Sequence, residues 1–188
     1  MKKIVFIIFV VVCLIQIAVP SKMIMDKEEI LSVGHMYKFR TAPVDPYDPF
    51  RGKYVTLTFD ARNVTAGDDS VWNTGESVYV LLGTDTAGYA MVQDIMHVSP
   101  SEENVNVDYV TGVVKYAYGK EVTIEYPFER FYMDENKAPE AEKQFNEANQ
   151  RNNTEQEAYA VVYVKNGEAA LKDVMIDGVS LRDLTEKK

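Results

Sequence analysis

The stretch AYAVVYVKNGEAALKDVMI, residues 158–176, decides the fold of this chain. Residues 158–164 and 168–176 have the composition of β-strands, and Asn166-Gly167 stands between them. This dipeptide favours a two-residue hairpin turn, because both turn positions need a positive φ. The sequence therefore predicts an antiparallel hairpin near the C-terminus, and Asp177-Gly178 marks a further tight turn directly after it.

Strand patterns continue upstream of this hairpin. In residues 53–60, Val55, Leu57 and Phe59 alternate with polar or amphipathic side chains, which is typical of a strand with one buried face. Residues 61–75 are polar and favour a loop. Further strands are expected at residues 35–40, 78–82, 89–98, 109–117 and 121–126, the last two forming a hairpin across Tyr118-Gly119.

One helix is expected inside this β-rich part. Pro139 suits the first position of a helix, and Ala141, Phe145 and Ala148 then recur on one face as a narrow apolar stripe. The pattern predicts a mainly β domain of the α+β class. Its antiparallel strands would form a barrel-like sheet or a sandwich that carries one amphipathic helix.

The N-terminus has the order of a targeting or membrane segment. Lys2 and Lys3 precede an apolar run at residues 4–19. Cleavage after this run is disfavoured by Pro20, and Val12 occupies the place where a lipoprotein needs a small residue before Cys13. We therefore predict an uncleaved signal-anchor transmembrane helix over residues 1–25 and an extracytoplasmic β-rich domain over residues 26–188. The N-terminal lysines place this domain on the periplasmic side of the cell membrane.

Composition narrows the function classes. The chain carries a net charge of −9, which disfavours nucleic acid as a partner. Its one cysteine, Cys13, lies in the apolar run, so the predicted domain has no thiol for a disulfide or a metal. His35 and His97 have no further ligand at metal-binding spacing, and we expect no cofactor.

Residues 43–59, PVDPYDPFRGKYVTLTF, are unusual on physical grounds. Three prolines within residues 43–49 stiffen the backbone, and Asp45 and Asp48 can cap nearby backbone N–H groups. Arg51 can bridge one of these carboxylates, and Gly52 permits a sharp turn into the following strand. The stretch predicts a rigid loop, which serves either as scaffold or as a binding surface.

Residues 52–59 carry a family resemblance. They resemble the Gly-Asp-Tyr-x-x-Leu-x-Tyr motif of the GDYXXLXY proteins, with Lys53 in place of the aspartate and Phe59 in place of the last tyrosine. Asp45, Asp48 and Arg51 fit the family's upstream run, and residues 131–135 are similar to its aromatic segment that ends in glutamate. The resemblance implies a membrane-associated bacterial protein of unassigned function, often associated with multi-pass membrane proteins.

Two functions follow as expectations. The first is a structural or protein-interaction module that acts with a membrane protein. The alternative is a binder of small molecules or peptides, with a groove near residues 43–59. The candidate interaction residues are Asp45, Asp48, Arg51, Gly52, Lys53, Tyr54 and Glu135.

We do not expect this protein to be an enzyme. The alternative to this expectation is a hydrolase. Type I signal peptidases also combine a membrane anchor with a β-rich domain and carry a strand similar to residues 52–55. Their chemistry needs a serine nucleophile shortly upstream, and residues 35–51 contain no serine and only Thr41 as an alcohol. Acid pairs such as Asp45 and Asp48 are expected by chance in a chain with 29 acidic residues.

Overall fold

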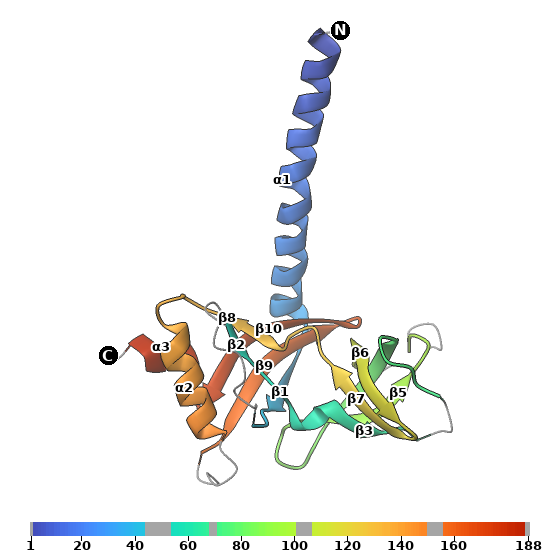
Figure 1. The fold of residues 1–188 in the computed structure, drawn as a ribbon, viewed down its shortest axis with the longest axis vertical. Helices are drawn as coiled ribbons and strands as arrows, with labels where there is room; N and C mark the ends of the chain where they lie inside the picture. Colours follow the sequence, from blue (N-terminus) through green and yellow to red (C-terminus); the bar gives the residue numbers. More distant parts are fainter. Residues whose placement is uncertain (1, 44–53, 68–70, 101–106, 150–155, 187–188) are drawn as a thin grey trace.

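A computed structural model describes residues 2–43, 54–67, 71–100, 107–149 and 156–186 (Figure 1). Helix α1, Lys2–Val33, projects from a β-rich domain as one continuous helix (Figure 1). The span Lys3–Val33 has a mean hydropathy of 2.8 in its most apolar window, none of which is buried in the protein, and is long and apolar enough to cross a membrane. The helix ends where the Gly34 N–H donates to the Ile30 carbonyl at 2.9 Å.

The first sheet lies at the base of α1. Its antiparallel order is β1-β9-β10-β11, with bounds His35–Arg40, Ala158–Lys165, Glu168–Ile176 and Val179–Ser180. The predicted hairpin is confirmed, because Asn166 and Gly167 take φ values of 50° and 83° between β9 and β10. Asp177 likewise takes a φ of 50° in the turn that follows β10.

A second sheet has the antiparallel order β3-β7-β6-β4-β5. In that order the strands span Asn63–Thr65, Glu121–Glu125, Tyr109–Tyr118, Ser77–Thr84 and Ala90–Met96. A third, two-stranded sheet pairs β2, Tyr54–Thr56, with β8, Arg130–Tyr132. Isolated bridges from Thr41 to Phe59 and from Val110 to Gly167 help to join these sheets into a nearly closed, barrel-like arrangement, which confirms the predicted fold class.

Within the described residues, two α-helices accompany the sheets. Helix α2, Ala138–Ala148, buries the predicted stripe completely or almost completely, with Ala141 and Phe145 at 0% exposed and Ala148 at 4%. It packs against β2 and against the short helix α3, Leu181–Glu186. In Figure 1, α2 and α3 lie on one side of the domain and the β3–β7 sheet on the other.

The strand predicted at residues 53–60 is shorter than expected. Strand β2 ends at Thr56, although the Leu57 N–H still donates to the Glu129 carbonyl at 2.8 Å, and a 3-10 helix, Asp60–Arg62, follows. The short strand β3 lies inside the predicted loop at residues 61–75, and β8 was not predicted as a strand. Three residues are too few to show a sequence period, so partner strands specify both β3 and β8.

An aromatic cluster fills the centre of the core. The rings of Phe39, Phe59, Tyr126 and Phe128 lie with centroids between 5.0 and 6.1 Å apart. Phe39 comes from β1 and is completely buried. The cluster therefore ties the sheet at the base of α1 to the segment that connects β7 with β8.

Candidate functional site

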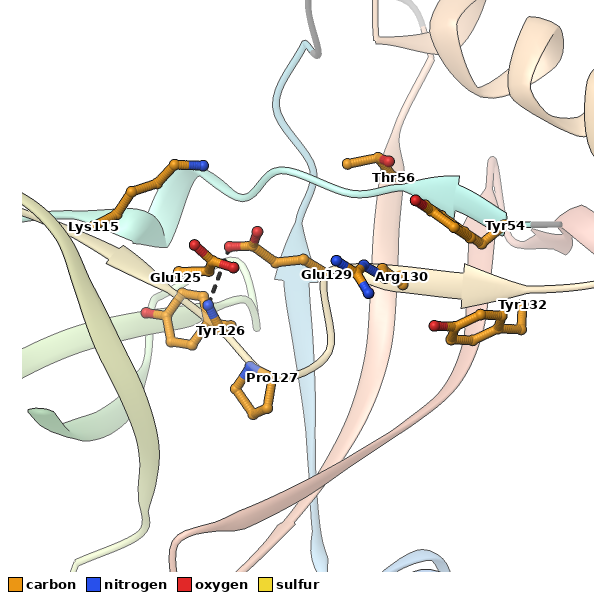
Figure 2. Close-up of a pocket in the computed structure, with 9 residues that line it drawn as sticks. All are labelled: Tyr54, Thr56, Lys115, Glu125, Tyr126, Pro127, Glu129, Arg130 and Tyr132. Atoms are coloured by element: carbon orange, nitrogen blue, oxygen red, sulfur yellow. Dashed lines mark hydrogen bonds between the residues drawn. The ribbon is translucent and has the colours of Figure 1, made fainter. Parts of the chain in front are cut away.

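A cavity of about 450 Å³ lies beside β2 and β8 and next to the β6–β7 hairpin (Figure 2). This volume is within the range of small-molecule sites. Most of the side chains that line it are polar or charged. They are Tyr54, Thr56, Lys115, Glu125, Tyr126, Pro127, Glu129, Arg130 and Tyr132.

Strand β2 supplies one wall of the pocket because its side chains alternate. Val55 is completely buried, as is Leu57 just after the strand, so this face belongs to the core. Tyr54 and Thr56 point the other way and are partly exposed at the pocket. The same short segment therefore stabilises the domain with one face and lines a cavity with the other.

Strand β8 places a cation among aromatic rings. The register sets Tyr54 opposite Tyr132, with ring centroids 5.5 Å apart. The guanidinium carbon of Arg130 lies 5.4 Å from the centre of the Tyr54 ring, which is within range of a cation–π contact. Tyr132 is exposed and lines the pocket.

Lys115 reaches the pocket from an irregularity in β6. The pairing of β6 with β7 shifts between Val114 and Tyr116, which leaves Lys115 as the extra residue of a β-bulge. A bulge bends its strand and redirects a side chain, and bulges are frequent next to functional sites. Lys115 is exposed and lines the cavity (Figure 2).

Of the two acids that line the pocket, Glu129 has the more buried side chain. It is half-buried, and its Oε1 atom accepts a hydrogen bond from the Tyr126 backbone N–H at 3.1 Å (Figure 2). Burial raises the pKa of the Glu129 carboxyl above its ordinary value, and the nearby Glu125 carboxylate raises it further. The hydrogen bond from Tyr126 and the positive charges of Arg62 and Lys115 oppose this shift without cancelling it.

The charges of the pocket balance one another without pairing. Glu125 and Glu129 contribute two carboxylates, and Lys115 and Arg130 contribute two cations. In the part of the chain that the structure describes, no ion pair joins either carboxylate to either cation. The site therefore offers both signs of charge to a ligand.

The comparisons with known proteins place the chain in a family. The family model described as GDYXXLXY protein matches residues 16–174, which is most of the 188-residue chain. The chain belongs to the GDYXXLXY family. Neither the curated proteins nor the solved structures gave a match.

In this GDYXXLXY protein, the structure describes part of the motif. Its tyrosine, Tyr54, lines the pocket, its leucine, Leu57, is completely buried, and Phe59 belongs to the aromatic cluster. Of the other predicted site residues, Glu135 is exposed after β8 and does not line the pocket. The predicted residues that lie outside the described part are Asp45, Asp48, Arg51, Gly52 and Lys53.

Sequence reasoning missed four charged residues of the site: Lys115, Glu125, Glu129 and Arg130. The bulge that redirects Lys115 leaves no sequence period, and the acids are two among 29. The only signal was proximity to the family's aromatic segment, because Arg130 directly precedes Phe131.

The two histidines lie elsewhere. His35 is exposed at the start of β1, with its Nδ1 atom 2.6 Å from Asp108. His97 stacks on the Trp72 ring at 3.7 Å and lies 2.9 Å from Glu76. Among the described residues, no group of three or more His, Cys, Asp or Glu side chains is arranged to hold a metal ion.

Proposed function

We propose that this protein is a membrane-anchored module whose extracytoplasmic β-rich domain acts with a membrane protein. The observation that carries the proposal is the junction between α1 and the domain. The side of the membrane is proposed from Lys2 and Lys3, because positive residues favour the cytoplasmic end of a spanning helix.

The last turns of α1 are built into the domain. Ile30 is only 4% exposed, and the base of the helix packs against β9 and β10. Lys27 Nζ lies 3.2 Å from both Glu168 Oε2 and the Ala169 carbonyl oxygen, while Lys165 forms an ion pair with Glu29. The helix is thus fastened to the β9–β10 hairpin.

A simple tether would need no such fastening. The span of 31 residues is roughly 46 Å long, against a hydrocarbon core of about 30 Å, so its base extends beyond the bilayer. Because α1 continues into the domain without a linker, an anchored α1 would hold the domain at a set height and orientation. A fixed orientation is useful when the domain must meet a partner that is itself fixed in the membrane.

A test of the proposal separates anchoring from orientation. A short Gly-Ser insert between Met25 and Asp26, ahead of the α1 residues that contact the β9–β10 hairpin, keeps the apolar run but lets the domain rotate. We expect affinity purification from membranes to recover a specific membrane protein with the unaltered chain and to lose it with this insert. The control is the same insert at Gly88, a turn position with open space around it. Equal recovery from both inserts would contradict the role of the fixed orientation.

A second test addresses the membrane placement. We expect a reporter that is active only in the periplasm to function when fused after Lys188, and the protein to stay with membranes after a carbonate wash. Release into the soluble periplasmic fraction would show that the apolar segment is cleaved and would remove the anchor.

The second candidate function is ligand binding beside the motif strand. The pocket lined by Tyr54 and Thr56 favours it, because a cavity of about 450 Å³ with charges of both signs provides both room and specific contacts. This function does not exclude a membrane partner, since the pocket and the base of α1 use different residues.

A further inference from the structure

We propose that the pocket beside β2 and β8 binds a small zwitterion, namely an amino acid or a short peptide with a free ammonium and a free carboxylate group. The inference rests on the second candidate function, ligand binding beside the motif strand. It does not depend on the membrane partner.

The first argument is the balance of charge. The whole chain carries a net charge of −9, yet the pocket lining holds two carboxylates and two cations. An anion would be attracted by Lys115 and Arg130 and repelled by Glu125 and Glu129, and a cation would meet the reverse. A ligand that carries both signs at its two ends gains from all four groups.

The second argument is the order of the groups. Figure 2 shows the Glu125 and Glu129 carboxylates close together in the middle of the pocket, with Lys115 toward one end. Arg130 lies on the other side of Glu129, toward Tyr54 and Tyr132. An ammonium group between the carboxylates would leave the ligand's carboxylate next to Arg130, whose planar guanidinium can donate two parallel hydrogen bonds.

The third argument is the state of Glu129. Its carboxyl is half-buried, and Tyr126 supplies one hydrogen bond to Oε1. Burial is the main cause that raises its pKa, and the Tyr126 hydrogen bond and the charges of Arg62 and Lys115 oppose this shift without cancelling it, so the ionised form remains disfavoured in the free pocket. A ligand ammonium would add a further positive charge beside this carboxyl, whereas a neutral sugar would not.

The fourth argument concerns the aromatic end. Tyr54 and Tyr132 lie beyond Arg130 and offer ring surface and hydroxyl groups. An amino-acid or peptide side chain would pack on these rings, because a tyrosine combines an apolar face with a polar tip. The pocket is thus divided into a charged part for the ligand's ends and an aromatic part for its side chain.

Titration calorimetry of the full chain in detergent micelles tests the inference. The probes are the standard amino acids and the dipeptide Ala-Ala. We expect at least one of them to bind. Its N-acetylated and carboxamide derivatives should each bind at least about tenfold more weakly, since each loses a charge-assisted interaction. Maltose serves as the neutral polar control.

Three outcomes would overturn the inference. The first is that none of the zwitterionic probes binds. The second is that the blocked derivatives bind as tightly as the parent zwitterion. The third is that maltose binds more tightly than every zwitterion, which would make the pocket a carbohydrate site.

Variants connect the binding to the pocket. Glu125→Gln and Lys115→Met should each lower the affinity for the zwitterion by about fivefold or more, because each removes one charge of the pocket lining. Lys143→Met is the matched control for Lys115→Met, since Lys143 is an exposed lysine on α2 outside the pocket. This variant should bind the zwitterion with unchanged affinity. Unchanged affinity in both pocket variants, with normal circular dichroism spectra, would contradict the site.

The two proposals fail separately. Recovery of the membrane partner, measured with the same pocket variants, reports on the membrane module, and calorimetry reports on the pocket. If no zwitterion binds while the partner is recovered in a manner that depends on the α1 junction, the pocket inference alone is wrong.

Discussion

The base of α1 and the pocket beside β2 use the same kinds of side chain to opposite effect. At the base of α1, Lys27 and Lys165 pair with Glu168 and Glu29 around the buried Ile30. In the pocket, two carboxylates and two cations lie near each other without an ion pair among the described residues. Ion pairs hold the junction together, whereas the pocket charges form no ion pair with one another, which is the basis of the proposed ligand site.

The difference also predicts which substitutions lower the stability of the fold and which raise it. The junction buries apolar surface and satisfies its polar groups, so changes there should weaken the fold. The pocket keeps a half-buried carboxyl with a raised pKa, which costs stability at neutral pH. Removing that charge should therefore strengthen the fold while it damages binding.

The largest expected effect is on the aromatic cluster that supports both regions. Phe39→Ala removes a completely buried ring that contacts Phe59, Tyr126 and Phe128. We expect a loss of about 3–5 kcal/mol in the free energy of unfolding, measured by chemical denaturation of the full chain in detergent micelles. Tyr118→Ala, at a residue 76% exposed, is the control and should stay within about 0.5 kcal/mol. Similar losses for both variants would show that the cluster is not the shared support.

The next effect separates the junction from the pocket. In Gly34→Ala, the new Cβ atom would lie 2.5 Å from the Ile30 carbonyl oxygen and 3.0 Å from that of Val164. The backbone must shift, at a cost of about 1–3 kcal/mol in unfolding free energy. Ser32→Ala on the exposed side of the same helix is the control. Zwitterion binding should be unchanged in both variants, and a binding defect in Gly34→Ala would show that the two regions are coupled.

A smaller effect tests the cost of the pocket carboxyl. Burial raises the folded-state pKa of Glu129 above the ordinary 4.5, so the folded protein holds its proton more tightly than the unfolded chain. Its contribution to stability is therefore present below 4.5 and is lost as the pH rises through the folded-state pKa. Glu129→Gln should raise the melting temperature at neutral pH, and this gain should vanish below pH 4.5.

The control for this measurement is Glu121→Gln, which changes an exposed carboxylate on the same strand as Glu125. It should show no comparable gain at neutral pH. A gain for Glu129→Gln that is equally large at acidic pH would mean that burial of the charge is not the cause.

The smallest effect is expected from a single ion pair of the junction. Lys165→Met removes the partner of Glu29, whose side chain is 60% exposed. Exposed pairs contribute about 0–1 kcal/mol because water screens them. A double-mutant cycle with Glu29→Gln should give a coupling energy in this range. A markedly larger coupling would show that the pair, rather than the packing of Ile30, fastens the helix.

Features that depend on neighbouring residues were predictable from the sequence. The turn at Asn166-Gly167, the apolar run of α1 and the stripe of α2 all arise from local φ preferences or from the period of one element. The motif at residues 52–59 also identified the family correctly. In each case the determining residues lie within a few turns or one strand of each other, so the signal is contained in a short window.

Tertiary structure alone decided the pocket. Tyr54 meets Tyr132 and Arg130 only because β2 pairs with β8, a contact between segments that are more than seventy residues apart in the sequence. Lys115 enters the site through a bulge in the pairing of β6 with β7, and half-buried Glu129 follows a segment whose Tyr126 and Phe128 belong to the aromatic cluster. Strand register, bulges and burial are properties of the partners that the chain finds on folding. The sequence therefore determined which residues can form strands and helices, and packing between distant strands determined which of their charges share a cavity.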